Sequence, residues 1–365
     1  MTSIVLTLLV NNSPAPTSVQ DALQQLVVET TVDGAGSFRL QLGMSPGDSG
    51  DWPQLDQSLF PPGASVRIGV AVDKPNPTFL MVGYVAAQSA VFGDGQVPPS
   101  VEISGVDATA LMNLEEKTVA WPNMADSVIA SQIFGSSQLV PQVTTTSPVL
   151  SDPEGTTLQR GTDIRFLRRL ARRNGFQVYV LPEPNSGVET GYFAPLSTSG
   201  SPVATLAVHA GDSTSVIDLK IANDMLRPTQ AVADGLDAQH SAQNGNVSTT
   251  SSTVGRTSTV GQLPKPTKLR LSGTGLTNST DLQRAAQAAV DRSSYALVAT
   301  GRVPATVGPL VPGTVISLSG AGDAYSGPWV LRQVKHTIAP GSYTQEFTAA
   351  RNGVGNTGLS AAVGM

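Results

Sequence analysis

Residues 158–180 read LQRGTDIRFLRRLARRNGFQVYV, and this stretch predicts a capped helix that runs directly into a strand. Thr162 or Asp163 can accept hydrogen bonds from the free N–H groups of the first helical turn. Gly175 fits the left-handed position that follows many helices. Apolar side chains first recur at helical spacing and then alternate after the glycine: Ile164, Leu167, Leu170 and Ala171, with Phe166 beside them, and then Phe176, Val178 and Val180.

Six arginines lie in or beside this predicted helix: Arg160, Arg165, Arg168, Arg169, Arg172 and Arg173. The last two fall in the final turn, where the helix dipole favours cations. A basic helix can contact DNA phosphates. We expect instead a solvated face or a salt-bridge surface between subunits. In a subunit of a larger assembly, such arginines could also line a lumen or meet acidic residues of a neighbour, and the sequence does not choose among these.

The same stretch resembles a segment of a known family, through the order of Asp163, Phe166, Leu167, Arg169, Leu170, Ala171 and Gly175. It is similar to the T/S-D-x-x-F-L-x-R-L-A-x-x-x-G segment of late-control-D phage tail hub proteins and of the hub part of VgrG-type spikes. His336 with Tyr343 and Phe347 is similar to the last hairpin of that family. The resemblance covers about residues 20–350. Arginine is denser here than in many VgrG helices, and no oligonucleotide-binding-type domain or β-helix spike follows Arg351.

Composition predicts a β-rich α+β protein. The chain has 365 residues, of which 40% are hydrophobic and only 13% charged, with 36 glycines and 26 prolines. Such a composition favours short strands joined by turns. The net charge of −5 gives no electrostatic footprint for nucleic acid. Cysteine is absent, which excludes disulfides and thiolate metal sites.

The apolar N-terminus, residues 1–10, predicts a first strand. It lacks the basic region of a secretory signal. No segment is long enough to span a bilayer. We therefore expect assembly in the cytoplasm and no direct membrane insertion.

An internal sequence repeat predicts two copies of one small β-barrel. Residues 60–70, FPPGASVRIGV, resemble residues 310–320, LVPGTVISLSG, at a shift of 250 positions. The same shift aligns Phe79 with Trp329. Each copy reads as a Pro-Gly turn, an alternating strand, a loop, and a strand opened by an aromatic residue.

The predicted domain boundaries follow from this sequence repeat. Residues 1–105 form the first tube-like barrel, and residues 106–182 form a mixed helical domain with the Asp163 helix. Residues 183–232 and 297–351 form a discontinuous second barrel. Residues 233–296 hold a Ser/Thr/Gly-rich linker (Ser241 to Lys268) and an Ala-rich helix (Asp281 to Val298). Residues 352–365 form a flexible tail.

Residues that could carry chemistry do not form a site in the sequence. The three histidines, His209, His240 and His336, are far apart and match no metal motif. The Gly47-Asp48-Ser49-Gly50 segment matches a serine-protease motif. In that protease fold the general-base histidine precedes the serine, whereas the first histidine here is His209. Paired carboxylates occur at Asp152 with Glu154 and at Glu115 with Glu116. A glycosidase needs an acid with a raised pKa and a defined separation between its two carboxyl groups, and the sequence shows neither. No phosphate-binding glycine motif is present. We therefore expect no enzyme, no cofactor, and no catalytic, cofactor-binding or metal-binding residues.

The family resemblance implies a structural baseplate hub of a phage tail or phage-like contractile injection system. It implies a homotrimer whose six barrels match a hexameric tail tube on one side and a separate trimeric spike protein on the other, among other baseplate proteins. The hub would become part of a virion or injection particle. Two other functions stay open: a cell-wall-degrading tail enzyme on a β-rich scaffold, and a carbohydrate- or receptor-binding module.

Overall fold

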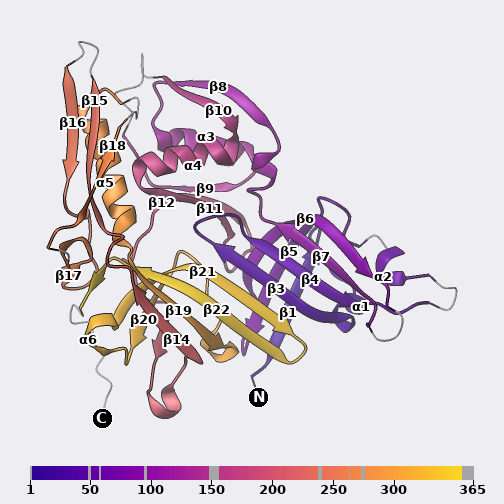
Figure 1. Ribbon diagram of the computed structural model, residues 1–365. Helices are drawn as coiled ribbons and strands as arrows, with labels where there is room; N and C mark the ends of the chain where they lie inside the picture. The colour runs from indigo at the N-terminus through magenta and orange to yellow at the C-terminus, as the bar shows by residue number, and fades with distance from the viewer. Residues whose placement is uncertain are drawn as a thin grey trace.

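The computed structural model describes residues 2–47, 51–56, 59–93, 97–147, 156–236, 241–262, 264–272 and 276–355. Its main feature is a 13-stranded sheet that runs through the lower part of the molecule (Figure 1). Two inserts rise from this sheet, and each combines helices with smaller sheets. The predicted fold class, a β-rich α+β protein, is confirmed.

The first half of the large sheet comes from the N-terminal part of the chain. Strand β6 (Thr78–Val91) is its corner, because it pairs with β5 up to Tyr84 and with β7 from Tyr84 onward. Alternating apolar residues of these strands point into one core that includes Leu26, Leu40, Ile68 and Ile103. The other elements are β1 (Ile4–Val10), β2 (Ser13–Pro14), α1 (Thr17–Asp21), β3 (Leu23–Thr31), β4 (Ser37–Gly43), α2 (Pro53–Asp56), β5 (Ser65–Val72) and β7 (Ser100–Val106).

The second half of the sheet is built around fully buried Trp329. Arg351 is also buried; its guanidinium donates to three backbone carbonyls and lies 5.9 Å from the Trp329 ring. The elements are β13 (Ala204–Ala207), η3 (Gly211–Ser213), β14 (Asp218–Asn223), β19 (Leu297–Pro304), η5 (Ala305–Val307), β20 (Val315–Ser319), α6 (Gly322–Tyr325), β21 (Gly327–Ala339) and β22 (Ser342–Arg351).

The two halves join where β21 pairs antiparallel with β3, from Gln333 opposite Thr31 to Ile338 opposite Leu26. Strand β3 has β4 on its other side. Because β21 occupies the edge of β3 that would close the first half, the strands of the described part form an open path and not two closed barrels.

The two copies of the sequence repeat occupy corresponding places in the two halves of the sheet. Gly63 and Gly313 have φ angles of +78° and +82°, and each precedes the strand that the shift aligns, β5 or β20. The register is not the same, since Phe79 lies opposite Gly69 whereas Trp329 lies opposite Ile316. The short helix α6 stands between β20 and β21 and accompanies this difference.

The first insert contains the helix that the sequence predicted. Helix α4 (Asp163–Asn174) ends at Gly175, which is left-handed with φ of +73°, and β11 follows at once. Thr162 is the N-cap residue, but its side chain makes no capping bond, which corrects one detail of the prediction. The other elements are η1 (Leu111–Asn113), β8 (Glu116–Pro122), α3 (Asp126–Ser136), β9 (Val140–Val143), β10 (Thr156–Thr162), β11 (Phe176–Pro182) and β12 (Glu189–Pro195).

The strand pairing differs from the predicted division of the chain at two places. Strand β12 pairs with β11 and β9, so it lies with the first insert, although residue 183 was to open the second barrel. The Ser/Thr/Gly-rich segment 241–268 was predicted as a linker, yet it contains strands and enters a three-stranded sheet. Composition suggested a linker there, but β15 (Thr229–Leu236) pairs with the two ends of the segment and β23 (Gly353–Val354) pairs with residues 257–258.

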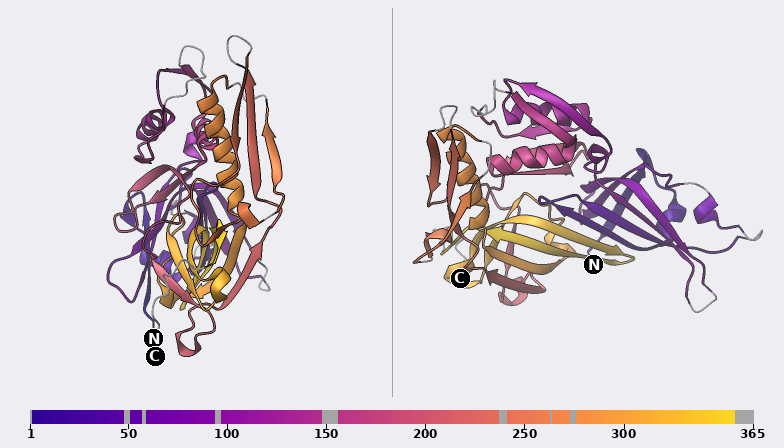
Figure 2. Two further views of the ribbon diagram at one scale, coloured as in Figure 1. Left: turned by 90° about the vertical axis from the view of Figure 1, so that its left-hand side faces the viewer. Right: turned by 45° about the horizontal axis from the view of Figure 1, so that its top comes forward.

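The second insert leaves and re-enters the sheet at one point. Strands β14 and β19 pair as far as Asn223 opposite Leu297, and the Asp224 amide donates to the Ala296 carbonyl at 3.0 Å. Helix α5 overlaps the predicted Ala-rich helix but ends at Ser294, because residues 297–298 already belong to β19. It packs on β15 and β16 (Figures 1 and 2). The elements are β15 (Thr229–Leu236), β16 (Ala242–Val247), β17 (Thr257–Ser258), η4 (Val260–Gln262), β18 (Thr267–Leu271) and α5 (Ser279–Ser294).

Strand β17 pairs with β23 (Gly353–Val354), which lies in the segment predicted as a flexible tail. Residues 356–365 of that segment lie outside the described part.

Gly175 generates a first prediction. A Cβ there would lie 3.1 Å from Ala288 Cα on α5, whereas a Cβ at Gly63, also left-handed, would meet nothing within 4 Å. Both Gly63→Ala and Gly175→Ala carry the cost of a left-handed alanine, on the order of 1 kcal/mol. We expect Gly175→Ala to lose roughly a further 1 kcal/mol or more, because the two inserts must move apart. Urea unfolding of both variants measures this; equal losses would contradict it.

His336 generates a second prediction. It is buried beside the seam, with Nδ1 2.9 Å from the Tyr343 hydroxyl, and burial lowers its pKa from 6.5 to about 3. The unfolded chain therefore takes up a proton near pH 6.5 while the folded protein does not. Stability is complete above that pH and falls as pH decreases toward 3, by about 2 kcal/mol between about pH 7 and pH 5.

The double variant His336→Phe with Tyr343→Phe removes this proton uptake and leaves no unpaired hydroxyl. We expect its free energy of unfolding to depend less on pH by that amount. Urea titrations of both proteins across this range provide the measurement. Parallel pH profiles would show that His336 does not titrate on unfolding.

Candidate functional site

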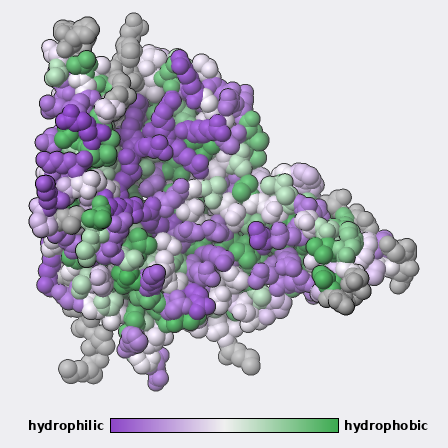
Figure 3. Space-filling view, in the orientation of Figure 1, coloured by the Kyte–Doolittle hydropathy of each residue, from purple (hydrophilic) through white to green (hydrophobic). Residues whose placement is uncertain are grey.

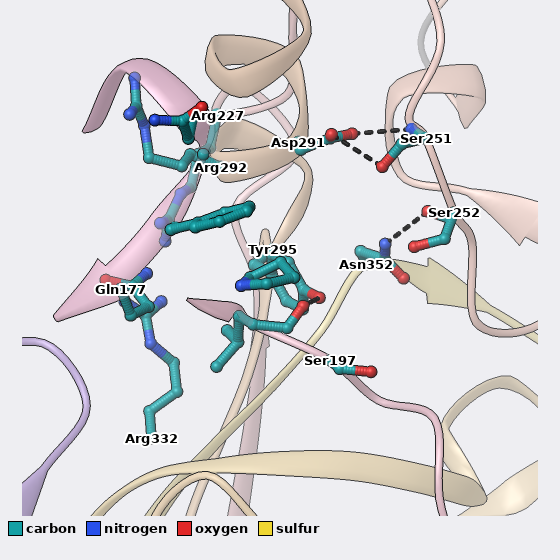
Figure 4. A pocket seen from close by; sticks show the side chains of 15 residues that line it. Gln177, Ser197, Arg227, Ser251, Ser252, Asp291, Arg292, Tyr295, Arg332 and Asn352 are labelled. Atoms are coloured by element: carbon teal, nitrogen blue, oxygen red, sulfur yellow. Dashed lines mark hydrogen bonds between the residues drawn. The ribbon is translucent and has the colours of Figure 1, made fainter. Parts of the chain in front are cut away.

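A cavity of about 400 Å³ lies where the two inserts meet the sheet (Figure 4). Its wall combines the end of α4, the start of β11, the end of α5 and one residue of β21. The polar side chains used below are Gln177, Arg227, Asp291, Arg292, Tyr295 and Arg332. We call this space the junction cavity.

Arg332 anchors the floor of the junction cavity. Its Nε and Nη2 donate to the two carboxylate oxygens of Asp33 at 2.9 and 2.5 Å, across 299 positions of sequence. The Arg332 side chain is 19% exposed, so this fork-shaped pair is partly shielded from water. It fixes the turn after β3 against β21 and thereby reinforces the seam.

Two further arginines give the cavity its positive character. Arg292 donates from Nη1 to the backbone carbonyl of Arg172 at the end of α4, which links the two inserts. Burial first, and then Arg172, lowers the pKa of Arg292. Burial, and then Arg332, lowers the pKa of Arg227. Neither Arg292 nor Arg227 forms an ion pair with an acid in the described residues.

Asp291, the acidic residue of the wall, already has hydrogen-bond donors for both of its carboxylate oxygens. It accepts from the Ser251 amide at 2.7 Å, the Ser251 hydroxyl at 2.8 Å and Gln287 Nε2 at 3.0 Å. Figure 4 shows it turned toward Ser251, on the side away from Gln177 and Arg332. Tyr295 donates to the Leu196 carbonyl at 2.7 Å, and burial raises its pKa to about 12. The polar groups left for a ligand are therefore mainly cationic.

The predicted arginine helix is held by acids on its buried side. Arg173 binds Asp126, a buried residue of α3, and Asn174 Nδ2 donates to the same carboxylate at 2.5 Å. At the other end, Asp163 accepts from Lys117 at 2.7 Å and from Gln159 at 2.7 Å. Asp163 therefore serves an ion pair between α4 and β8, and not a cap.

A second polar cluster lies between the first insert and the first half of the sheet, beside a cavity of about 490 Å³. The Tyr84 hydroxyl donates to Glu189 Oε2 at 2.7 Å. Glu189 Oε1 is buried and has no hydrogen-bond partner in the described residues, and burial raises the pKa of this carboxyl. Glu115 and Asp163 line the same cavity.

The residues weighed from the sequence for chemistry do not come together. His209 is exposed on a loop and His336 lies in the core, while His240 is outside the described residues. Asp48, Ser49, Gly50, Asp152 and Glu154 are also outside them. Glu115 lines the second cavity, whereas Glu116 faces Arg165 at 3.5 Å on the surface.

The described residues contain neither a metal-binding cluster nor a membrane-spanning helix. They contain no group of three or more histidines, cysteines and acids placed to hold a metal ion. None of their helices combines the length and apolar character needed to cross a bilayer.

The junction cavity was missed in the sequence because its walls come from seven distant segments. Residues 174–177, 195–197, 227, 251–252, 291–295, 332 and 352 meet only through the packing of both inserts on the sheet. The one available signal was Arg227-Pro228, which the sequence identified as a turn and not as part of a site.

Known structures share this fold. A tail protein from Neisseria meningitidis is similar at a TM-score of 0.68 and 14% identity, over 96% of this chain and 97% of that one. The 43 kDa tail protein of prophage MuSo2 from Shewanella oneidensis is similar at 0.64 and 12%, over 95% and 97%. An E. coli component of the type VI secretion system is similar at 0.55 and 12%, over 90% and 73%. At these identities the likeness concerns the fold.

Sequence comparison gives a family that the motif did not suggest. No curated protein matches the chain. The family model that matches, over residues 2–340, is described as the Alg8 N-terminal domain, and not as late control D. The motif in residues 158–180 thus pointed to the fold of tail and VgrG-type proteins but not to this family. Because the match spans most of the sequence, the chain belongs to the Alg8 N-terminal domain family.

Proposed function

We propose that this protein is a structural hub of a phage tail or phage-like contractile injection system. The observation that carries the proposal is the likeness of nearly the whole chain to two phage-type tail proteins. The fold is also similar to a type VI secretion component whose structure resembles the bacteriophage T4 tail proteins gp27 and gp5. A mechanical role needs no catalytic residues, and we propose that the protein is not an enzyme.

The finer proposal is a symmetry adaptor. Two similar half-sheets per chain, with matching Pro-Gly turns at Gly63 and Gly313, would give six similar units in a homotrimer. Six units suit a hexameric tail tube, and three chains suit a trimeric spike supplied as a separate protein. The hub would assemble in the cytoplasm with these and other baseplate proteins and then reside in the particle.

Light scattering of the purified full chain tests the adaptor. We expect a trimer, which is three times 37.7 kDa, and a six-lobed axial view by electron microscopy. If the chain is monomeric alone, co-expression with the spike and tube proteins of its own gene cluster should give the trimer. A stable dimer, or a monomer in both preparations, would contradict the adaptor.

A cell-wall-degrading tail enzyme is the second candidate, and Glu189 is the observation that favours it. A buried carboxyl with a raised pKa beside a cavity is what a general acid requires. If this function holds, Glu189→Gln should abolish lysis of purified peptidoglycan while particles still assemble. We expect no lysis by the unaltered protein, and clear lysis by it would overturn the purely structural role.

A further inference from the structure

The solvent face of α4 consists of arginine alone. The exposed residues of this 12-residue helix are Arg165, Arg168, Arg169 and Arg172. Figure 3 shows a broad hydrophilic area over this helix. Like charges at spacing i, i+4, as in Arg168 and Arg172, destabilise a helix. The face is therefore unfavourable for the isolated chain, which suggests an external partner.

Two of these arginines make no ion pair with an acid in the part of the chain that the structure describes. Arg165 faces Glu116, and Arg169 donates to the Leu158 carbonyl at 2.6 Å and covers the Phe166 ring. In the described residues, Arg168 and Arg172 form no ion pair. Buried Asp107 is close enough to Arg168 for its carboxyl to feel the charge, but it is occupied by Gly36 and Thr109.

Positive charge continues from α4 into the junction cavity, where Arg227 also feels the charges of Asp224 and Asp33. Arg292 binds the Arg172 carbonyl and lines the cavity, and Arg227 lines it too. We call Arg168, Arg172, Arg292 and Arg227 the arginine strip. Part of the strip compensates the negative ends of α4 and α5. Those ends carry about half a charge each, so the four cations leave an excess of positive charge.

We propose that the arginine strip docks an acidic segment of a partner protein, and that the junction cavity receives one carboxylate of that segment. Guanidinium groups bind carboxylates through two parallel hydrogen bonds. Within the described residues, Arg292 uses one of its five donors, toward the Arg172 carbonyl. The cavity volume of about 400 Å³ accommodates a side chain with room for neighbouring atoms. Gln177 adds an amide to the wall.

A protein partner fits the strip better than nucleic acid does. The chain as a whole carries 27 acidic and 22 basic residues, so a long polyanion would meet repulsion beyond the strip. Helix α4 is only about 18 Å long, and the strip ends in a cavity. A short acidic segment with one inserted side chain uses both features.

Fluorescence anisotropy tests the docking with the full chain. The probe is a labelled dodecapeptide of alternating Glu and Ser, and a labelled duplex DNA of 12 base pairs serves as the competing class. The test variant combines Arg168→Gln, Arg172→Gln and Arg227→Gln. Its matched control combines Arg39→Gln, Arg270→Gln and Arg302→Gln, which remove the same charge from exposed strand positions.

We expect the peptide to bind the unaltered protein, and to bind the strip variant at least about tenfold more weakly, since each lost charged hydrogen bond is worth about that factor. The control should change affinity less than about twofold. Equal weakening in both variants, absence of peptide binding to the unaltered protein, or tighter binding of the DNA would overturn the proposal.

Arg292→Lys tests the cavity itself. Lysine keeps the charge and one donor for the Arg172 carbonyl but loses the fork. We expect severalfold weaker peptide binding with an unchanged melting temperature. Unchanged binding would show that no carboxylate enters the cavity.

Discussion

The pairing of β3 with β21 is the contact on which the other parts of the structure depend. It makes one 13-stranded sheet from two halves that are far apart in the sequence. Both inserts rest on that sheet, so their mutual position follows from it. The Asp33–Arg332 ion pair and neutral His336 sit at this seam. A buried strand edge, satisfied by backbone hydrogen bonds, explains why the halves need not close separately.

Local order could be predicted from the sequence, whereas pairing over long distance could not. The helix at Asp163, its glycine end and the strand after it follow from spacing and capping chemistry within 23 residues. The repeated Pro-Gly turns located β5 and β20 correctly. Whether β3 pairs within its own half or with β21 depends on strands three hundred residues apart, and no local pattern encodes that choice.

The misjudged segment 241–268 and the junction cavity share one physical cause. Intrinsic strand preferences span only about 1 kcal/mol and depend on context, so partners decide whether such a segment is ordered. Here β15 supplies the partner for both β16 and β18. The cavity likewise exists only after α4, α5 and β21 have been assembled. The arginines on α4 were evident in the sequence, but their relation to Arg292 and Arg227 was not.

The narrow neck of the second insert has an evolutionary consequence. Asn223 and Leu297 are neighbours across two paired strands, so a short turn between them would preserve the pairing of β14 with β19. Proteins can gain, lose or exchange such a module while the scaffold persists. Two of the four strip arginines, Arg227 and Arg292, belong to this module, and the other two belong to α4. Replacing this one module would therefore remove half of the arginine strip and leave Arg168 and Arg172 on α4.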